Sequence, residues 1–191
     1  TRAPDELDTY DAKLAVKKLA DAGLAYIAFS GGEPLVRRDL FEIIEEVKRN
    51  EMAFSIATNG TMATPRISKQ LRDLDCAFVQ VSLDGATAKT HDAFRGADCF
   101  DRTVTGIRNL VEAGIQVGVS TTVTKENLAE VPSIVDISEQ LGAMLFMNYN
   151  FIPTGRGAAL KEKDLTPKER EELLTWMAGE IGKRKINLLS T

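Results

Sequence analysis

The chain has 191 residues, 43% hydrophobic and 27% charged, which is enough to bury one full-sized core, so we expect a single domain over residues 1–191. Its 24 basic and 28 acidic residues are interspersed and give a net charge of −4, which argues against nucleic acid or an anionic membrane as a partner. No apolar run is long enough to cross a bilayer, and the two cysteines, Cys76 and Cys99, lack metal-ligand spacing, so the composition favours a cytoplasmic protein with reduced thiols.

Helical and strand patterns alternate along the chain. A helix is predicted at residues 9–22, and its expected core face consists of Leu14, Ala15, Leu19 and Ala22. Short runs rich in β-forming residues predict strands at 25–29, 54–57, 78–83, 116–122 and 144–151. The helices expected between them cover 40–50, 65–74, 100–113 and 131–141. A capping box of Thr166 and Glu169 begins a last helix, and 186–189 predicts the start of another strand.

This alternation predicts a parallel α/β sheet, either an open doubly wound sheet or a (β/α) barrel, and the pattern alone does not separate the two. In both architectures, functional groups gather beyond the carboxyl ends of the strands. The residues that follow each predicted strand are therefore the candidates for a binding site.

The first predicted strand is followed by Ser30-Gly31-Gly32-Glu33-Pro34. Two glycines allow the backbone to turn close to a ligand and expose its carbonyls, and Glu33 places a carboxylate beside them. Such a turn suits a ligand amine. The competing interpretation is an ordinary strand-to-helix turn with a solvated glutamate.

The next two strands end in Thr58-Asn59-Gly60 and Ser82-Leu83-Asp84-Gly85. Each segment alone is typical of a turn or a helix cap. Together with the first turn, they predict a rim of small polar groups that hydrogen-bond a ribose and the polar end of an amino acid.

This series of motifs resembles the radical SAM superfamily, which carries Gly-Gly-Glu-Pro, Thr-Asn-Gly and Ser-Leu-Asp-Gly after successive strands. The segments that start at Arg37, His91 and Gly155 are also similar to it. The resemblance implies an α/β fold, a partial (β/α)6 barrel with parallel strands, whose first strand and cluster loop are absent from the chain.

The resemblance also implies a role for individual residues. Gly31, Gly32 and Glu33 are expected to receive the amino group of S-adenosylmethionine, with Pro34 stiffening the turn. Thr58, Asn59 and Ser82 are expected at the methionyl and ribose part. The remaining cofactor residues are expected to be Asp84, Arg95 and Ile152, the last against the adenine. The expected substrate residues are Asn148, Asn150 and Arg156.

One family feature is missing from the sequence. The superfamily binds a [4Fe-4S] cluster with a Cys-x3-Cys-x2-Cys loop, and neither Cys76 nor Cys99 matches such a position. We therefore expect the cluster ligands to lie outside this chain, through truncation or disorder. The chain alone is expected to be inactive and to contribute no metal ligand.

The implied activity is that of an iron-sulfur oxidoreductase, which cleaves S-adenosylmethionine reductively to a 5′-deoxyadenosyl radical that abstracts hydrogen from a substrate. The implied substrate is a haem precursor or a peptide, and the implied electron donor is a flavodoxin or ferredoxin. The segment after residue 150 is similar to members with auxiliary clusters in a C-terminal extension.

Two other functions remain open. One is a cluster-free module that binds S-adenosylmethionine or a nucleotide for regulation. The other is a barrel lyase with a Schiff-base lysine, which is disfavoured because no lysine falls at a strand end and Lys125 follows a strand only after Thr124. For His91 we expect a solvated or helix-capping role and no catalysis, and for Cys76 we expect packing as a small apolar side chain.

Overall fold

The computed structural model describes residues 6–153 and 161–190, and it contains a six-stranded parallel sheet with the order β1-β2-β3-β4-β5-β6. A doubly wound sheet needs a reversal of strand order, and this order has none. The topology therefore confirms a partial (β/α) barrel. The strands are β1 (Tyr26–Phe29), β2 (Ala53–Thr58), β3 (Phe78–Ser82), β4 (Val117–Val123), β5 (Leu145–Asn150) and β6 (Asn187–Ser190).

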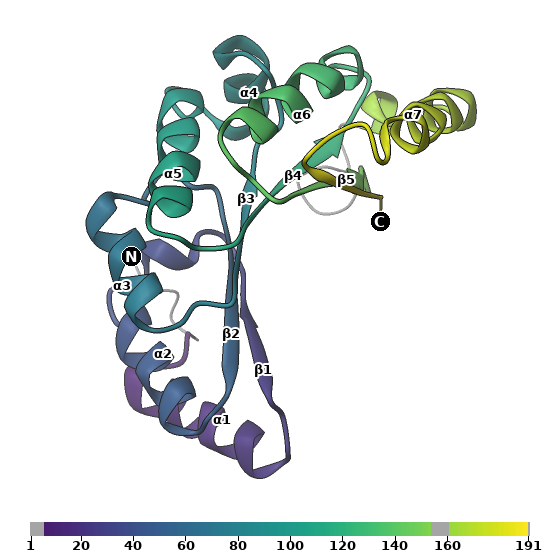
Figure 1. Ribbon diagram of the computed structural model, residues 1–191. Helices are drawn as coiled ribbons and strands as arrows, with labels where there is room; N and C mark the ends of the chain where they lie inside the picture. Colours follow the sequence, from purple (N-terminus) through teal and green to yellow (C-terminus); the bar gives the residue numbers. More distant parts are fainter. Residues whose placement is uncertain (1–5, 154–160, 191) are drawn as a thin grey trace.

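Helices connect the strands and lie along one face of the sheet, which leaves the opposite face open (Figure 1). Their bounds are α1 (Thr9–Asp21), α2 (Leu40–Arg49), α3 (Pro65–Asp73), α4 (Ala88–Arg95), α5 (Phe100–Glu112), α6 (Val131–Gln140) and α7 (Pro167–Glu180), with short 3-10 turns η1 (Pro34–Val36) and η2 (Leu128–Glu130). Within the described ranges, no helix is long and apolar enough to span a membrane.

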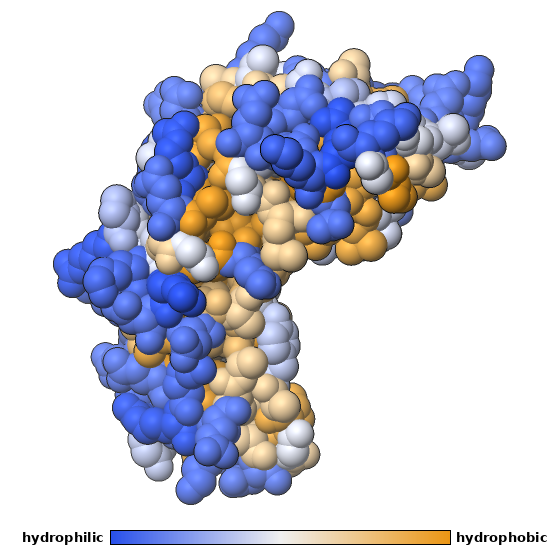
Figure 2. Space-filling model, in the orientation of Figure 1, coloured by the Kyte–Doolittle hydropathy of each residue, from blue (hydrophilic) through white to orange (hydrophobic). Residues whose placement is uncertain are grey.

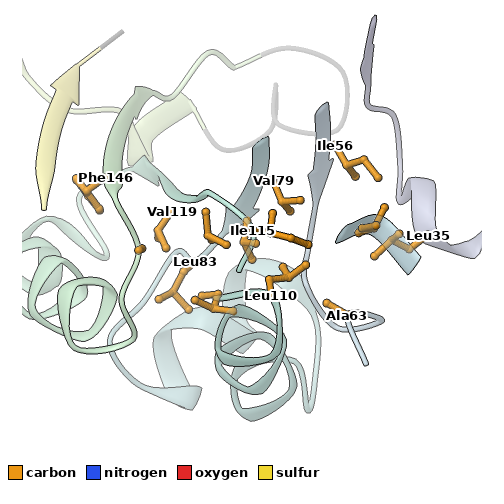
Figure 3. Close-up of a cluster of buried hydrophobic side chains, with 14 of the residues drawn as sticks. Leu35, Ile56, Ala63, Val79, Leu83, Leu110, Ile115, Val119 and Phe146 are labelled. Carbon is orange, nitrogen blue, oxygen red and sulfur yellow. The ribbon is translucent and has the colours of Figure 1, made fainter. Parts of the chain in front are cut away.

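The core lies between the sheet and these helices. Side chains from neighbouring strands point to the same side, because parallel strands pair in register and successive side chains alternate between faces. Ile56 pairs with Val79, Val119 pairs with Phe146, and all four are at most 1% exposed. Leu110 of α5 packs against this row (Figure 3). This layer holds each strand end, and therefore the loop that follows it, in a fixed position.

The opposite face of the sheet is not covered by helices. Figure 2 shows apolar surface along this side, within the angle between the lower strands and the α7 arm. Tyr26 on β1 and Leu189 on β6 are 48% and 46% exposed. Among the described residues, β1 and β6 each pair with one strand only, so the barrel stays open between them.

The structure corrects two details of the predicted helices. The buried residues of α1 are Ala12 and Val16, whereas the predicted core residues Leu14 and Leu19 are 38% and 40% exposed. Hydrogen bonds from α1 to α2 and to Asp39, the residue before α2, fix the rotation of α1. Thr9 Oγ1 donates to Asp39 at 2.7 Å. Helix α4 was not predicted, because it is short and mostly polar.

Candidate functional site

The glycine turn lies at the carboxyl end of β1. Gly31 has a φ of +139°, which a residue with a side chain rarely adopts. A Cβ atom placed on Gly31 or Gly32 would meet nothing within 4 Å, so this stretch of backbone is open to a ligand. Glu33 precedes η1, and its Oε1 accepts from the backbone N–H of Leu35 at 3.0 Å. The turn therefore ends in a carboxylate with a fixed orientation.

Two residues at the end of β2 hold the same carboxylate. The Thr58 hydroxyl donates to Glu33 Oε1 and the Asn59 backbone N–H donates to Oε2, both at 2.7 Å. Thr58 is 4% exposed. A carboxylate has about four acceptor positions, so these three donors leave room for a further one. The structure thus brings Gly31, Gly32, Glu33, Thr58 and Asn59 together, with Thr58 and Asn59 supporting Glu33.

Asp84 follows β3 and is fully buried, at 0% exposure. Its Oδ1 accepts from the Thr122 backbone N–H of β4 at 2.7 Å, and its Oδ2 accepts from Nε of Arg95. Both carboxylate oxygens are therefore engaged within the protein. Ser82, two residues earlier, is half-buried and pairs in register with Ser120 on β4.

His91 and Asn127 complete the surroundings of Asp84, and neither was predicted as a functional residue. His91 is 1% exposed inside α4, which corrects the expected solvated or capping role. Its Nδ1 accepts from the Asp84 backbone N–H at 3.1 Å, and burial lowers the pKa of the imidazole. Asn127 is 2% exposed and donates to the Asp84 carbonyl at 2.9 Å. We call Asp84, His91, Arg95 and Asn127 the Asp84 cluster.

Arg95 is the part of this cluster that reaches the surface. Its side chain is 31% exposed, and its guanidinium lies 5.6 Å from the centre of the Phe94 ring. In the part of the chain that the structure describes, Arg95 donates one hydrogen bond, from Nε to Asp84. The two Nη groups are therefore available to an anion at the rim.

The residues expected at the substrate and adenine lie in different environments. Asn148 is 1% exposed and shares the helix-covered face with Phe146, where its amide donates to the Ser190 hydroxyl at 3.1 Å. This position does not favour contact with a substrate. Asn150 is exposed and accepts from Arg170, and Ile152 is 70% exposed just beyond β5. Arg156 lies outside the described residues.

The uncovered face also carries polar residues that were not predicted as site residues, namely Gln80, Ser120 and Tyr149. Gln80 donates to the Ser120 hydroxyl at 3.1 Å and accepts from the Tyr149 hydroxyl at 3.4 Å, which connects β3, β4 and β5. The signal was present in the sequence, because Gln80 and Ser82 alternate with the buried Val79 and Val81 along β3.

The cysteines of the chain do not fit a metal cluster. Cys76 is half-buried, its thiol donates to the Phe78 carbonyl at 3.5 Å, and burial raises its pKa to about 11. Its expected packing against the core is confirmed. Cys99 lies at the start of α5, far along the chain from Cys76. Over residues 6–153 and 161–190, no group of three His, Cys, Asp or Glu side chains is placed to hold a metal ion.

The fold and the rim define a class of protein, an open parallel (β/α) barrel with a glycine-glutamate turn at the first described strand end and polar side chains at the next two. The sequence matches the radical SAM superfamily over residues 1–137, more than half of its length. The chain belongs to the radical SAM superfamily.

Similar proteins include a haem synthase and a mycofactocin maturase. The chain is 37% identical over 187 residues to AdoMet-dependent heme synthase of Methanosarcina barkeri. The aligned region covers 97% of this chain and 53% of the relative. The chain is 32% identical over 181 residues to mycofactocin maturase MftC of Mycobacterium tuberculosis, covering 94% and 46%. The chain thus spans about half the length of the curated relatives it matches.

Solved structures share the fold. SuiB of Streptococcus suis bound to its precursor peptide SuiA has a TM-score of 0.83 with 15% identity, covering 100% of this chain and 43% of SuiB. The anSMEcpe structure with bound AdoMet and the Cp18Cys peptide has a TM-score of 0.77 with 19% identity, covering 95% and 55%. At these identities the likeness establishes the fold alone.

Proposed function

We propose that this chain supplies the S-adenosylmethionine-binding part of a radical SAM enzyme. One observation carries the proposal: in a chain of this superfamily, the Glu33 carboxylate stands at an open glycine turn and is held by groups from the neighbouring strand. The turn combines exposed backbone with a fixed negative charge. This combination suits the ammonium group of an amino acid.

The remaining rim residues would then bind other parts of the cofactor. Ser82 supplies a hydroxyl at the next strand end, and the Nη groups of Arg95 suit the methionyl carboxylate. The exposed Ile152 offers an apolar surface for the adenine. Thr58 and Asp84 act indirectly, because the Thr58 hydroxyl is bonded to Glu33 and the Asp84 carboxylate to Arg95. Asn59 supports Glu33 through its backbone N–H. Pro34 is buried and keeps the exit of the turn rigid.

When bound beside a reduced [4Fe-4S] cluster, S-adenosylmethionine supplies a 5′-deoxyadenosyl radical that removes a hydrogen atom from a substrate. Cys76 and Cys99 do not fit as cluster ligands, so we assign the cluster to cysteines that are not among these 191 residues. The part played by the residues described here is to bind and orient the cofactor and to restrict water at the rim. A flavodoxin or ferredoxin is the proposed electron donor.

We propose a haem precursor or a peptide as the substrate. The relatives support both, since their names include a haem synthase and a mycofactocin maturase, and the similar SuiB structure holds a precursor peptide. The uncovered face of the sheet is the place for it. Arg156 lies outside the described residues and stays a candidate on its sequence position alone, and Asn150, at the end of β5, is bonded to Arg170 of α7. Asn148 is left out because its side chain lies on the helix side.

The proposal is tested with the protein expressed from its complete gene and reconstituted anaerobically with iron and sulfide. We expect a four-iron signal in EPR and release of 5′-deoxyadenosine from S-adenosylmethionine after reduction with dithionite. Neither signal, combined with retained binding of S-adenosylmethionine, would overturn the enzymatic proposal and support a cluster-free binding module. Loss of binding as well would reject both.

A further inference from the structure

Every polar group of Asp84 is occupied by a different part of the chain. The backbone N–H donates to His91 in α4 at 3.1 Å, and the carbonyl accepts from Asn127 at 2.9 Å. Of the carboxylate oxygens, one accepts from the Thr122 backbone at 2.7 Å and the other from Arg95. Asp84, His91 and Asn127 are 0%, 1% and 2% exposed. Asp84 therefore has no freedom to rotate.

His91 contributes an acceptor at a place where the fold requires one. Its Nδ1 accepts a hydrogen bond from the Asp84 backbone N–H, so the imidazole is neutral and carries its proton on Nε2. The ring packs edge-on to Phe100 with centroids 5.9 Å apart. Gly85 permits this arrangement, since a Cβ atom there would lie 2.5 Å from the His91 backbone nitrogen. The Asp84-Gly85 pair and the His91 helix are thus built to fit each other.

Asn127 fixes the opposite side of Asp84. Its amide group donates to the Asp84 carbonyl at 2.9 Å and to the Thr122 carbonyl at 3.0 Å. Its own carbonyl accepts from the Thr124 backbone at 2.8 Å. One side chain therefore joins the loop after β3 to the end of β4. This joint keeps the Asp84 carboxylate next to the Thr122 N–H.

We infer that His91 and Asn127 are positioning residues that fix Asp84 and, through it, the guanidinium of Arg95 for binding the carboxylate of S-adenosylmethionine. The inference rests on the proposed function, in which Arg95 meets that carboxylate. The Asp84 carboxylate cannot rotate and holds the guanidinium of Arg95 at its Nε. The Nη groups of the guanidinium therefore point in one direction only. An arginine fixed in this way loses little conformational freedom when the ligand binds.

A purely structural cluster would behave differently. If the cluster only held the loop after β3, its disturbance would weaken every contact of the cofactor to a similar extent. If it orients Arg95, the disturbance affects the carboxylate of the ligand and spares the adenosine and amino groups. Decarboxylated S-adenosylmethionine lacks only that carboxylate, so it separates the two cases.

The test measures dissociation constants of both ligands by equilibrium dialysis, with the complete reconstituted protein kept anaerobic. His91→Phe removes the acceptor but retains an aromatic ring, whereas His91→Asn retains an acceptor. We expect His91→Phe to weaken binding of S-adenosylmethionine about 10-fold and to leave the decarboxylated ligand within about 2-fold. His91→Asn should restore most of the loss. Arg95→Ala sets the upper limit of the effect.

Asp84→Asn provides the second variant if His91→Phe does not fold. It preserves shape and one acceptor oxygen but removes the charge that holds Arg95, and the same selective loss is expected. Equal weakening of both ligands, or no change for either in a folded variant, would overturn the positioning role. If the wild-type protein binds neither ligand, the proposed function fails, which is a separate outcome from failure of this inference.

Discussion

Replacing Glu33 by glutamine tests the central contact of the rim. Glu33 Oε1 accepts from Thr58 and Leu35 at 2.7 Å and 3.0 Å, and Oε2 accepts from the Asn59 backbone at 2.7 Å. A glutamine that keeps its oxygen at the first two donors directs its NH₂ group at the Asn59 N–H. Two donors then face each other, and the charge is lost. Hydrogen bonds to a charged group contribute about 1.5–3 kcal/mol each, so the free energy of unfolding should fall by about 2–3 kcal/mol.

Glu33→Gln should also weaken the binding of the cofactor. Loss of one charge-assisted contact to the ligand ammonium corresponds to about 10- to 100-fold in the dissociation constant for S-adenosylmethionine. Equilibrium dialysis of the reconstituted complete protein measures this constant, and urea unfolding measures the stability. Thr58→Val removes one supporting donor and leaves the charge, so both effects should be smaller, with about 1 kcal/mol lost in stability.

Glu42→Gln is the matched control for Glu33→Gln. Glu42 lies on α2 and pairs with Lys13 at 3.1 Å, and its side chain is 62% exposed. An exposed pair of this kind contributes about 0–1 kcal/mol, so stability and cofactor affinity should stay close to the wild type. If Glu33→Gln proves as mild as Glu42→Gln in both measurements, the assignment of Glu33 to the ligand ammonium is wrong.

Three further predictions concern His91, two glycines and the cysteines. Burial lowers the pKa of His91 below its ordinary 6.5, so the unfolded chain binds more protons than the native state. The native state therefore loses stability as pH falls below 6.5. Urea unfolding at pH 8 and 5.5 should show a larger loss of unfolding free energy for wild type than for His91→Phe. Gly106→Ala places a Cβ atom 2.1 Å from a backbone carbonyl oxygen in the loop after β2, so it should lower the free energy of unfolding by about 1–3 kcal/mol. In the control Gly179→Ala on α7, the Cβ atom meets nothing within 4 Å, so stability should not fall. At pH 8, iodoacetamide should label Cys99 before Cys76, whose pKa is raised to about 11, and equal labelling by mass spectrometry would contradict the burial of Cys76.

The sequence predicted the strands well because each is a short β-rich run between clear helix ends. The alternation of elements alone did not predict the strand order. The family resemblance implied a partial barrel, and the order β1 to β6, which has no reversal, confirms it over a doubly wound sheet. Helix α4 escaped notice because one residue of its eight, His91, is buried, so no apolar stripe marks it. The predicted face of α1 was wrong because several rotations of that helix bury small apolar residues equally well.

The sequence predicted which rim residues lie close together. It did not predict which of them hydrogen-bond to one another. Parallel strand ends meet at one edge of a sheet, so Glu33 and Thr58 were expected to lie close together. That Thr58 donates to Glu33, instead of facing a ligand, depends on side-chain rotamers that the sequence does not specify. Asn127 had no signal at all, since an asparagine in a loop is ordinary turn chemistry.

The two rim carboxylates differ in what their surroundings leave available. Glu33 is half-buried, accepts three hydrogen bonds and keeps acceptor capacity toward an open turn. Asp84 is at 0% exposure, and both its oxygens are committed to the neighbouring strand and to Arg95. In the proposed function, the ligand ammonium therefore binds to Glu33 directly, whereas Asp84 acts only by orienting Arg95. Since each acid accepts at least one hydrogen bond from the end of the next strand along the chain, the parallel register helps to keep a negative group at one strand end and a positive group at another. The opposite charges of an amino acid zwitterion require such an arrangement.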